Sequence, residues 1–167
     1  MPEALVVADS GPLIAFSLLG RLDLLRDVYT SVLVPEAVWR EVTSGSPDRP
    51  GVVEIPGCPL LVRTAIAGSV DGLLRAELGP GEAEAITLAI ERGGARLLLD
   101  ERQARRIAEI VYGLSIRGTV GTVVLAKRRG LIPAVRPLLE QMRAGGYFLS
   151  TALIESACAT VDEMGAT

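Results

Sequence analysis

Short apolar runs alternate along the chain with longer stretches in which apolar residues recur at helical spacing. The short runs predict strands over residues 4–9, 31–35, 95–100 and 114–118, and an extra or edge strand over 59–66. The longer stretches predict helices over 12–28 (with a break or bend at Gly20), 35–42, 79–94, 101–113, 119–130, 133–144 and 150–161. Strands that alternate with helices of about ten or more residues predict an α/β fold, with a central, mainly parallel sheet in a three-layer α/β/α arrangement.

Chain length and composition narrow the class of protein. The 167 residues fit one domain over 1–167 with a substantial core, and the net charge of −3 gives no overall sign of a strongly basic nucleic-acid surface. The two cysteines, Cys58 and Cys158, are far apart and form no CxxC motif, so we expect a reduced, cytoplasmic setting. No apolar run reaches the roughly 20 residues that a membrane-spanning helix needs.

The absence of histidine is the most informative feature of the composition. It excludes Ser-His-Asp and Cys-His nucleophile systems, and it excludes zinc sites that use histidine. Two cysteines are also too few for an all-cysteine zinc site. If the protein is an enzyme, its chemistry is expected to use carboxylates with a hard metal ion bound to their oxygens.

Two predicted strands end in an aspartate. Asp9 follows "LVVA" and Asp100 follows "RLLL". Ligands of open parallel sheets bind beyond the carboxyl ends of the strands, which is where both side chains are expected. The alternative for either residue is a role only as the N-cap of the next helix. Capping by Ser10 would free Asp9 for a ligand.

The helix predicted over 79–94 begins with two glutamates, Glu82 and Glu84. They are two positions apart, so their side chains point roughly 200° apart on a helix. Glu82 shares its side with Ile86 and Ala89, which places it on the core-facing stripe and favours it as an inward ligand, with Glu84 as the second choice.

The helix over 35–42 poses a similar choice between Glu36 and Glu41, which periodicity alone does not settle. Several carboxylates in one cleft repel each other and raise one another's pKa, and a bound divalent cation removes that penalty. A cluster of this kind with Mg²⁺ or Mn²⁺ suits hydrolysis of a nucleic-acid backbone.

Five segments in this order resemble the PIN domain family, and within it the small prokaryotic proteins associated with toxin–antitoxin pairs. The segments are "VVADSGPLIAF", "VPEAVWREV", "GPGEAEAITLA", "LLLDERQARRIA" and "RGTVGTVVLAKRRGLI", and together they cover about residues 4–155. The resemblance implies an α/β/α ribonuclease fold with an acidic site for Mg²⁺ or Mn²⁺. It also implies a role as the toxin of a pair, acting on single-stranded or structured RNA and bound by an antitoxin protein.

The resemblance also assigns residues to the site. The four acids of the family match Asp9, Glu41, Glu82 and Asp100, although the third family acid is commonly Asp rather than Glu. Ser10 occupies the usual small-hydroxyl position, and Thr119 matches a position that borders the site.

Basic residues near this site are candidates for contacts with a phosphate backbone. Arg102, Arg105 and Arg117 are the best candidates, together with Ser10 and Thr119, as a substrate-binding set. The cluster at 127–129 is expected to be a solvated helix end. The few aromatic residues, Tyr147 among them, form no base-stacking motif and are expected to pack.

The sequence leaves two rival functions open. A phosphatase with Asp9 as its nucleophile is disfavoured, because the haloacid-dehalogenase pattern requires a second Asp where Gly11 stands. A catalytically weak or inactive module that binds nucleic acid or a partner requires only that the acids be helix caps. The apolar helices near 12–28 and 133–157 offer a surface for a homodimer.

Overall fold

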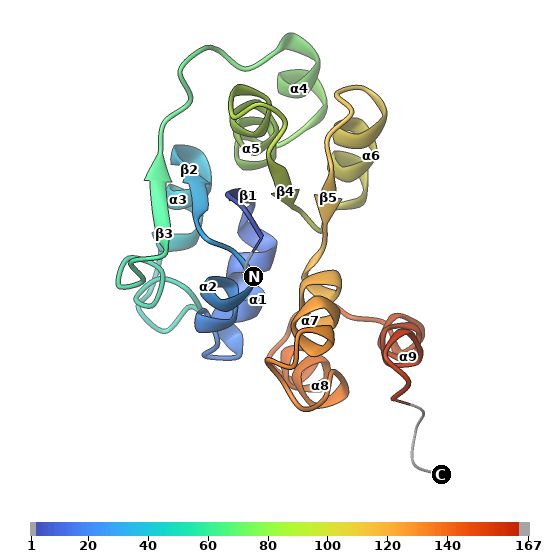
Figure 1. Ribbon diagram of the computed structural model, residues 1–167. Helices are drawn as coiled ribbons and strands as arrows, with labels where there is room; N and C mark the ends of the chain where they lie inside the picture. Colours follow the sequence, from blue (N-terminus) through green and yellow to red (C-terminus); the bar gives the residue numbers. More distant parts are fainter. Residues whose placement is uncertain (1–2, 164–167) are drawn as a thin grey trace.

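A five-stranded parallel sheet forms the centre of the protein in this computed structural model, which describes residues 3–163 (Figure 1). The ends of the expected domain, residues 1–2 and 164–167, lie outside the described part. The strand order is β3-β2-β1-β4-β5, and every pairing is parallel. The strands are β1 (Val6–Ala8), β2 (Val32–Pro35), β3 (Leu61–Thr64), β4 (Arg96–Leu98) and β5 (Ile116–Arg117). The run at 59–66 therefore provides an edge strand.

Nine helices accompany the sheet within residues 3–163. They are α1 (Ser10–Leu18), α2 (Asp23–Val28), α3 (Glu36–Thr43), α4 (Gly72–Glu77), α5 (Pro80–Glu91), α6 (Arg102–Ile110), α7 (Thr119–Arg128), α8 (Arg136–Ala144) and α9 (Thr151–Thr160). Gly20 has a φ of +62° and lies between α1 and α2, so the helix predicted over 12–28 is two helices. Helix α4 was not among the predicted elements. It begins after Asp71, whose side chain accepts a hydrogen bond from the backbone of Leu73 at 2.7 Å.

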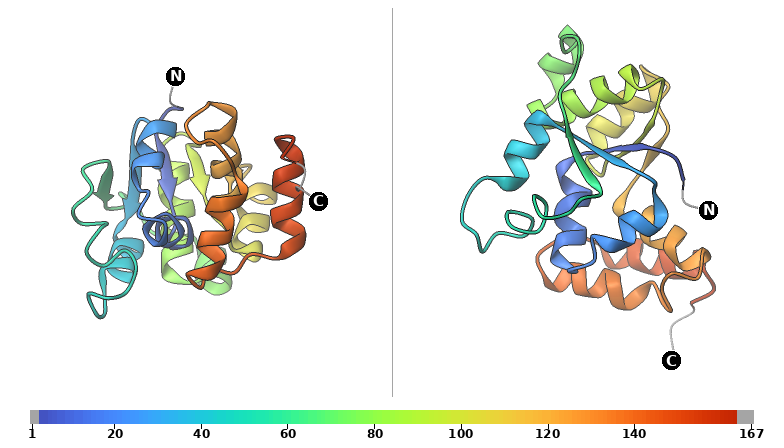
Figure 2. Two further views of the ribbon diagram at one scale, coloured as in Figure 1. Left: turned by 90° about the horizontal axis from the view of Figure 1, so that it is seen from below. Right: turned by 60° about the vertical axis from the view of Figure 1, so that its left-hand side comes forward.

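Alternate residues of the strands face opposite layers of helices. Val6 and Ala8 of β1 belong to a core shared with α1, α2, α7, α8 and α9, whereas Val7 belongs to a core shared with α4, α5 and α6. The views in Figure 2 show these helices on the two sides of the sheet. This arrangement confirms the predicted three-layer α/β/α fold. Among residues 3–163, no helix combines the length and apolar character needed to cross a membrane.

The connections of the strands define where a ligand would bind. After β1 the chain turns to β2 on one side of it, and it later returns to β4 on the other side. The direction of winding therefore changes between β1 and β4, and open α/β sheets bind their ligands at such a point, beyond the carboxyl ends of the strands. Asp9 follows β1 and Asp100 follows β4 closely, so both predicted acids lie at this point.

Candidate metal centre

A cavity of about 310 Å³ opens at the carboxyl edge of the sheet and gathers three of the four predicted acids. Asp9 comes from the end of β1, Glu41 from α3 and Glu82 from the first turn of α5. The remaining lining residues are Ser10, Gly79, Pro80 and Gly81. Helix α3 packs against both α1 and α5, which is how residues more than 70 positions apart along the chain come to line one cavity.

Asp9 is the most buried of these acidic residues, and only 5% of its surface is exposed. It occupies the N-cap position of α1, yet its side chain caps no backbone N–H, and its Oδ1 atom has no hydrogen-bond partner within the described residues. Burial raises the pKa of Asp9 to about 7, and the charges of Glu82, Glu41 and Asp100 contribute to the rise. Ser10 is the first residue of α1 and not its N-cap, so the Asp9 side chain is left free of capping without the help of Ser10.

Glu82 and Glu84 have different partners. The Glu82 Oε2 atom accepts a hydrogen bond from the backbone N–H of Gly79 at 3.1 Å, in a capping box that leaves its other oxygen for the cavity. Burial raises the pKa of Glu82, with contributions from Glu101 and Glu41. Glu84 Oε2 instead accepts from the backbone N–H of Ala37 at 2.8 Å, which satisfies a free donor at the start of α3. The structure thus brings Glu82, and not Glu84, to the cavity of Asp9.

The carboxylates of Glu41 and Asp9 both lie close to Gly81. A β-carbon added at Gly81 would lie 3.0 Å from Glu41 Oε2 and 3.6 Å from Asp9 Oδ1. Gly81 is a buried residue of α5, and its missing side chain leaves space between the two carboxylates. Glu36, which periodicity did not separate from Glu41, forms a two-pronged ion pair with Arg63 on β3 and does not line the cavity.

Asp100 is held by donors from two distant segments. Its Oδ1 atom accepts from the Thr119 backbone N–H at 2.8 Å, and its Oδ2 atom accepts from the Thr119 hydroxyl at 2.6 Å and from the Tyr147 hydroxyl. The cap of α6 is the neighbouring Glu101, which accepts two backbone N–H bonds. The alternative in which Asp100 is only the cap of that helix is therefore wrong.

Tyr147 is a site residue that the sequence analysis missed. The aromatic residues were expected only to pack, but the Tyr147 hydroxyl binds Asp100, and burial together with the charge of Asp100 raises the pKa of Tyr147. Tyr147 is far from Asp100 along the chain, so no sequence motif with a fixed spacing predicts their contact. The "GGYFLS" segment offers one clue, because its two glycines introduce a short irregular stretch of aromatic and apolar residues between two helices.

The predicted basic residues divide into two groups. Arg102 and Arg105 line a groove of about 670 Å³ that also includes Asp100 and Tyr147. The Arg105 guanidinium donates to the Leu99 carbonyl at 3.1 Å, which fixes it at the start of this groove. Arg102 is exposed.

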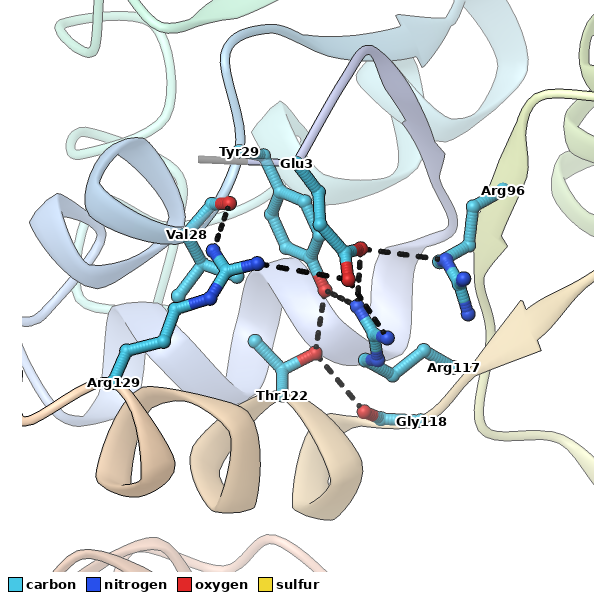
Figure 3. A network of polar contacts seen from close by, with 8 residues as sticks. All are labelled: Glu3, Val28, Tyr29, Arg96, Arg117, Gly118, Thr122 and Arg129. Carbon is cyan, nitrogen blue, oxygen red and sulfur yellow. Dashed lines mark hydrogen bonds and ion pairs between the residues drawn. The ribbon is translucent and has the colours of Figure 1, made fainter. Parts of the chain in front are cut away.

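Arg117, the third predicted basic residue, pairs with an acid of the fold. It forms an ion pair with Glu3 at 2.5 Å, and its side chain is only 17% exposed. Figure 3 shows the surrounding network, in which Arg96 and Arg129 also approach Glu3, at 3.4 and 3.7 Å. The charge of Arg117 is therefore paired inside the fold, but Arg117 also lines the groove of Arg102 and Arg105, and its contact with a phosphate stays a prediction.

Further hydrogen bonds connect this network to the start of α7. Arg117 donates to the Tyr29 hydroxyl at 3.3 Å, and the Tyr29 and Thr122 hydroxyls lie 3.1 Å apart. Thr122 in turn donates to the Gly118 carbonyl at 3.1 Å. Gly118 precedes Thr119, so the network supports the turn that holds Asp100.

The carboxylates fit a divalent cation that keeps several of its waters. Within residues 3–163, no three His, Cys, Asp or Glu side chains are arranged closely enough to form a complete set of metal ligands. Mg²⁺ needs no such set, because it commonly binds proteins through one or two carboxylates and retains waters. The unpartnered, buried Asp9 Oδ1 atom beside Glu41 and Glu82 is the kind of oxygen that a cation would stabilise.

The fold and these acids together define a class: α/β/α proteins with a carboxylate centre at the switch point of a parallel sheet. A family model described as a PIN domain matches residues 5–163, and the chain therefore belongs to the PIN domain family. This confirms the resemblance on which the assignment of the acids was based. PIN domains are generally nucleases and typically use divalent metals. No curated protein and no solved structure matches the chain.

Proposed function

We propose that this protein is a metal-dependent endoribonuclease that cleaves single-stranded or structured RNA at the cavity of Asp9. The observation that carries the proposal is the Asp9 carboxylate, which is buried, caps no helix and has no partner for Oδ1, although it lies among other acids. A buried charge without a partner is costly to the fold, and a site that binds a cation and a phosphodiester accounts for that cost.

The residues around the cavity have different proposed roles. Asp9, Glu41, Glu82 and Asp100 are the acids that would hold Mg²⁺ or Mn²⁺, which when bound neutralises charge on the phosphodiester and activates water for hydrolysis. Thr119 and Tyr147 fix the orientation of Asp100 by donating to its oxygens. Arg105 and Arg102 offer positive charge to the RNA backbone beside Asp100. Ser10 lines the cavity next to Asp9 and is proposed to contact the substrate.

Cleavage of labelled single-stranded RNA with Mn²⁺, with Mg²⁺ and with EDTA tests the proposal. We expect cleavage that requires the metal and is lost in Asp9→Asn. The pair Glu82→Gln and Glu84→Gln provides a matched control, because both changes remove one charge from the first turns of α5 but only Glu82 lines the cavity. Cleavage should fall strongly in the first variant and persist in the second. Equal activity in wild type, Asp9→Asn and EDTA would trace the cleavage to a contaminant.

A toxin role for this activity is a further part of the proposal, and it has its own test. Expression of the wild-type chain in a bacterial host is expected to arrest growth, whereas Asp9→Asn is not. An antitoxin would relieve the arrest and bind the chain directly. If Mn²⁺ binds the wild-type protein and not Asp9→Asn, and no RNA is cleaved, the protein is a binding module with an intact acidic centre rather than a nuclease.

A further inference from the structure

Phe148 is almost completely solvent-exposed, at 92%, although it is one of only two phenylalanines in the chain. It lies in the irregular segment between α8 and α9. Tyr147 on one side turns inward to bind Asp100, and Leu149 on the other side is buried at 6% exposure. Ser150 then caps α9 by accepting from the backbone N–H of Leu153 at 3.1 Å.

These neighbours fix the position of Phe148. Its backbone is held by an inward residue on each side and by a helix cap two residues later. The aromatic ring is therefore presented to solvent from an anchored segment rather than from a mobile loop. A ring ordered in this way can bind a planar ligand with little further loss of conformational entropy.

The surroundings of Phe148 are positively charged and lead to the acidic centre. The groove of about 670 Å³ is lined by Phe148 and Leu153 together with Arg102, Arg105 and Asp100. Within residues 3–163, neither of these two arginines forms an ion pair with a carboxylate. The groove thus combines an aromatic face with guanidinium groups and shares Asp100 with the proposed centre.

We propose that this groove is a nucleobase-binding subsite for single-stranded RNA, with Phe148 as the stacking surface and Arg102 and Arg105 as contacts to the neighbouring phosphates. Aromatic side chains beside a positively charged groove are the usual means by which proteins hold unpaired nucleotides. The inference rests on the proposed function, because it places the nucleotides next to the phosphodiester that the acids would act on.

A second copy of the chain is the main rival occupant of this surface. A two-fold interface brings the same patch of both copies together, so it would bring the guanidinium groups of Arg102 and Arg105 from both copies into one interface. Like charges facing each other are unfavourable in an interface. A polyanion with planar bases matches both the charge and the exposed ring, and the observations therefore favour RNA.

The experiment measures binding of a short fluorescent oligouridylate by anisotropy in EDTA, where metal-dependent cleavage does not interfere. The full-length wild type is compared with Phe148→Leu, which keeps an apolar side chain without a π face, and with Phe148→Trp, which keeps the aromatic face. Leu73→Ala is the control for loss of an exposed apolar side chain, because Leu73 lies on α4 and does not line the groove. A second oligonucleotide of the same length and charge carries abasic sites.

We expect Phe148→Leu to weaken binding of oligouridylate about tenfold, which is the effect of losing one stacked base, and Phe148→Trp to retain it. The abasic oligonucleotide should bind the wild type about as weakly as oligouridylate binds Phe148→Leu, and that variant should not distinguish the two oligonucleotides. Leu73→Ala should behave as wild type. Equal binding of both oligonucleotides by the wild type, or an unchanged affinity in Phe148→Leu, overturns the proposal.

Two further measurements separate this inference from the nuclease proposal and from the rival occupant. Asp9→Asn should lose cleavage and keep base-dependent binding in EDTA, so a wild type that binds through Phe148 without cleaving RNA supports the subsite and refutes the nuclease. Conversely, metal-dependent cleavage that is unchanged in Phe148→Leu refutes the proposed subsite and leaves the nuclease proposal intact. If Phe148→Leu turns a dimer into a monomer in sedimentation equilibrium and leaves RNA affinity unchanged, the groove is an interface between copies, and the proposal is wrong.

Discussion

Replacing Asp9 by Asn is expected to stabilise the metal-free protein at alkaline pH while it abolishes metal binding. Asp9 is ionised in the folded protein only at the expense of burial and of repulsion by Glu82, Glu41 and Asp100, which together raise its pKa from an ordinary 3.8 to about 7. At about 1.4 kcal/mol for each pH unit, this difference corresponds to roughly 4 kcal/mol of stability.

The sign of the effect follows from the direction of the pKa change. An acid whose pKa is higher in the folded state binds its proton more tightly there than in the unfolded chain. The free energy of unfolding is therefore highest below the ordinary pKa of 3.8, falls as the pH rises towards about 7, and stays low above that value. Asn carries no charge at any of these pH values, so the variant should lack this part of the pH dependence.

Urea unfolding in EDTA at about pH 5 and about pH 8 measures the difference, and linear extrapolation gives the free energies. We expect Asp9→Asn to exceed the wild type by about 2–4 kcal/mol at the higher pH, since the buried amide still requires hydrogen-bond partners of its own. Asp48→Asn makes the same chemical change in an exposed loop and should leave the pH dependence unaltered. Identical pH dependence in the wild type and in Asp9→Asn would refute the reasoning.

A divalent cation provides the complementary measurement. Mn²⁺ at one hundred times its dissociation constant stabilises a protein that binds it only when folded by about 2.7 kcal/mol. The wild type should gain stability on addition of Mn²⁺, and the gain should be larger at the higher pH, where Asp9 need not release a proton. Asp9→Asn should gain nothing under the same conditions.

Three further predictions concern residues around the centre. Gly81→Ala should weaken Mn²⁺ binding in calorimetry by about tenfold without unfolding the protein, because the new β-carbon would lie 3.0 Å from Glu41 Oε2 in a helix that otherwise favours alanine; unchanged affinity would contradict it. Glu84→Gln should lower the free energy of unfolding by about 0.5–1 kcal/mol in urea, since a charged acceptor for Ala37 is lost, and a drop in Mn²⁺ affinity would argue against this structural role. Glu3→Gln should destabilise by about 1–2 kcal/mol, and by less at high salt, because three partly exposed guanidinium groups lose their shared carboxylate; a salt-independent loss would point to packing instead.

The sequence predicted those parts of the centre that depend on local pattern. Asp9 and Asp100 follow apolar runs that become parallel strands, so the fold class alone places them at one edge of the sheet. Glu82 was separated from Glu84 by the apolar face of its own helix, and the structure brings Glu82 to the cavity. Glu41 required the resemblance to the PIN family, because both glutamates of α3 flank the same apolar stripe.

Partners far apart in the chain account for what the sequence did not predict. The Arg117 guanidinium is neutralised by Glu3, 114 positions earlier, and no local pattern announces this pairing. The Tyr147 hydroxyl binds Asp100 across 47 positions, and Phe148 is exposed between two neighbours that are held inward. The left-handed backbone of Gly20 separates two helices, whereas the sequence predicted only a break or bend at this residue.

The anchoring of Asp100 gives a meaning to the order in which the site residues are synthesised. All four acids have been synthesised by residue 100, but two of the donors that orient the last of them belong to Thr119 and Tyr147. A growing chain that has emerged only as far as α6 carries the complete set of carboxylates and lacks the hydroxyls that position Asp100. The donors that orient Asp100 are therefore complete only when the segment after α8 is in place, so the geometry of the proposed centre depends on residues made well after its last acid.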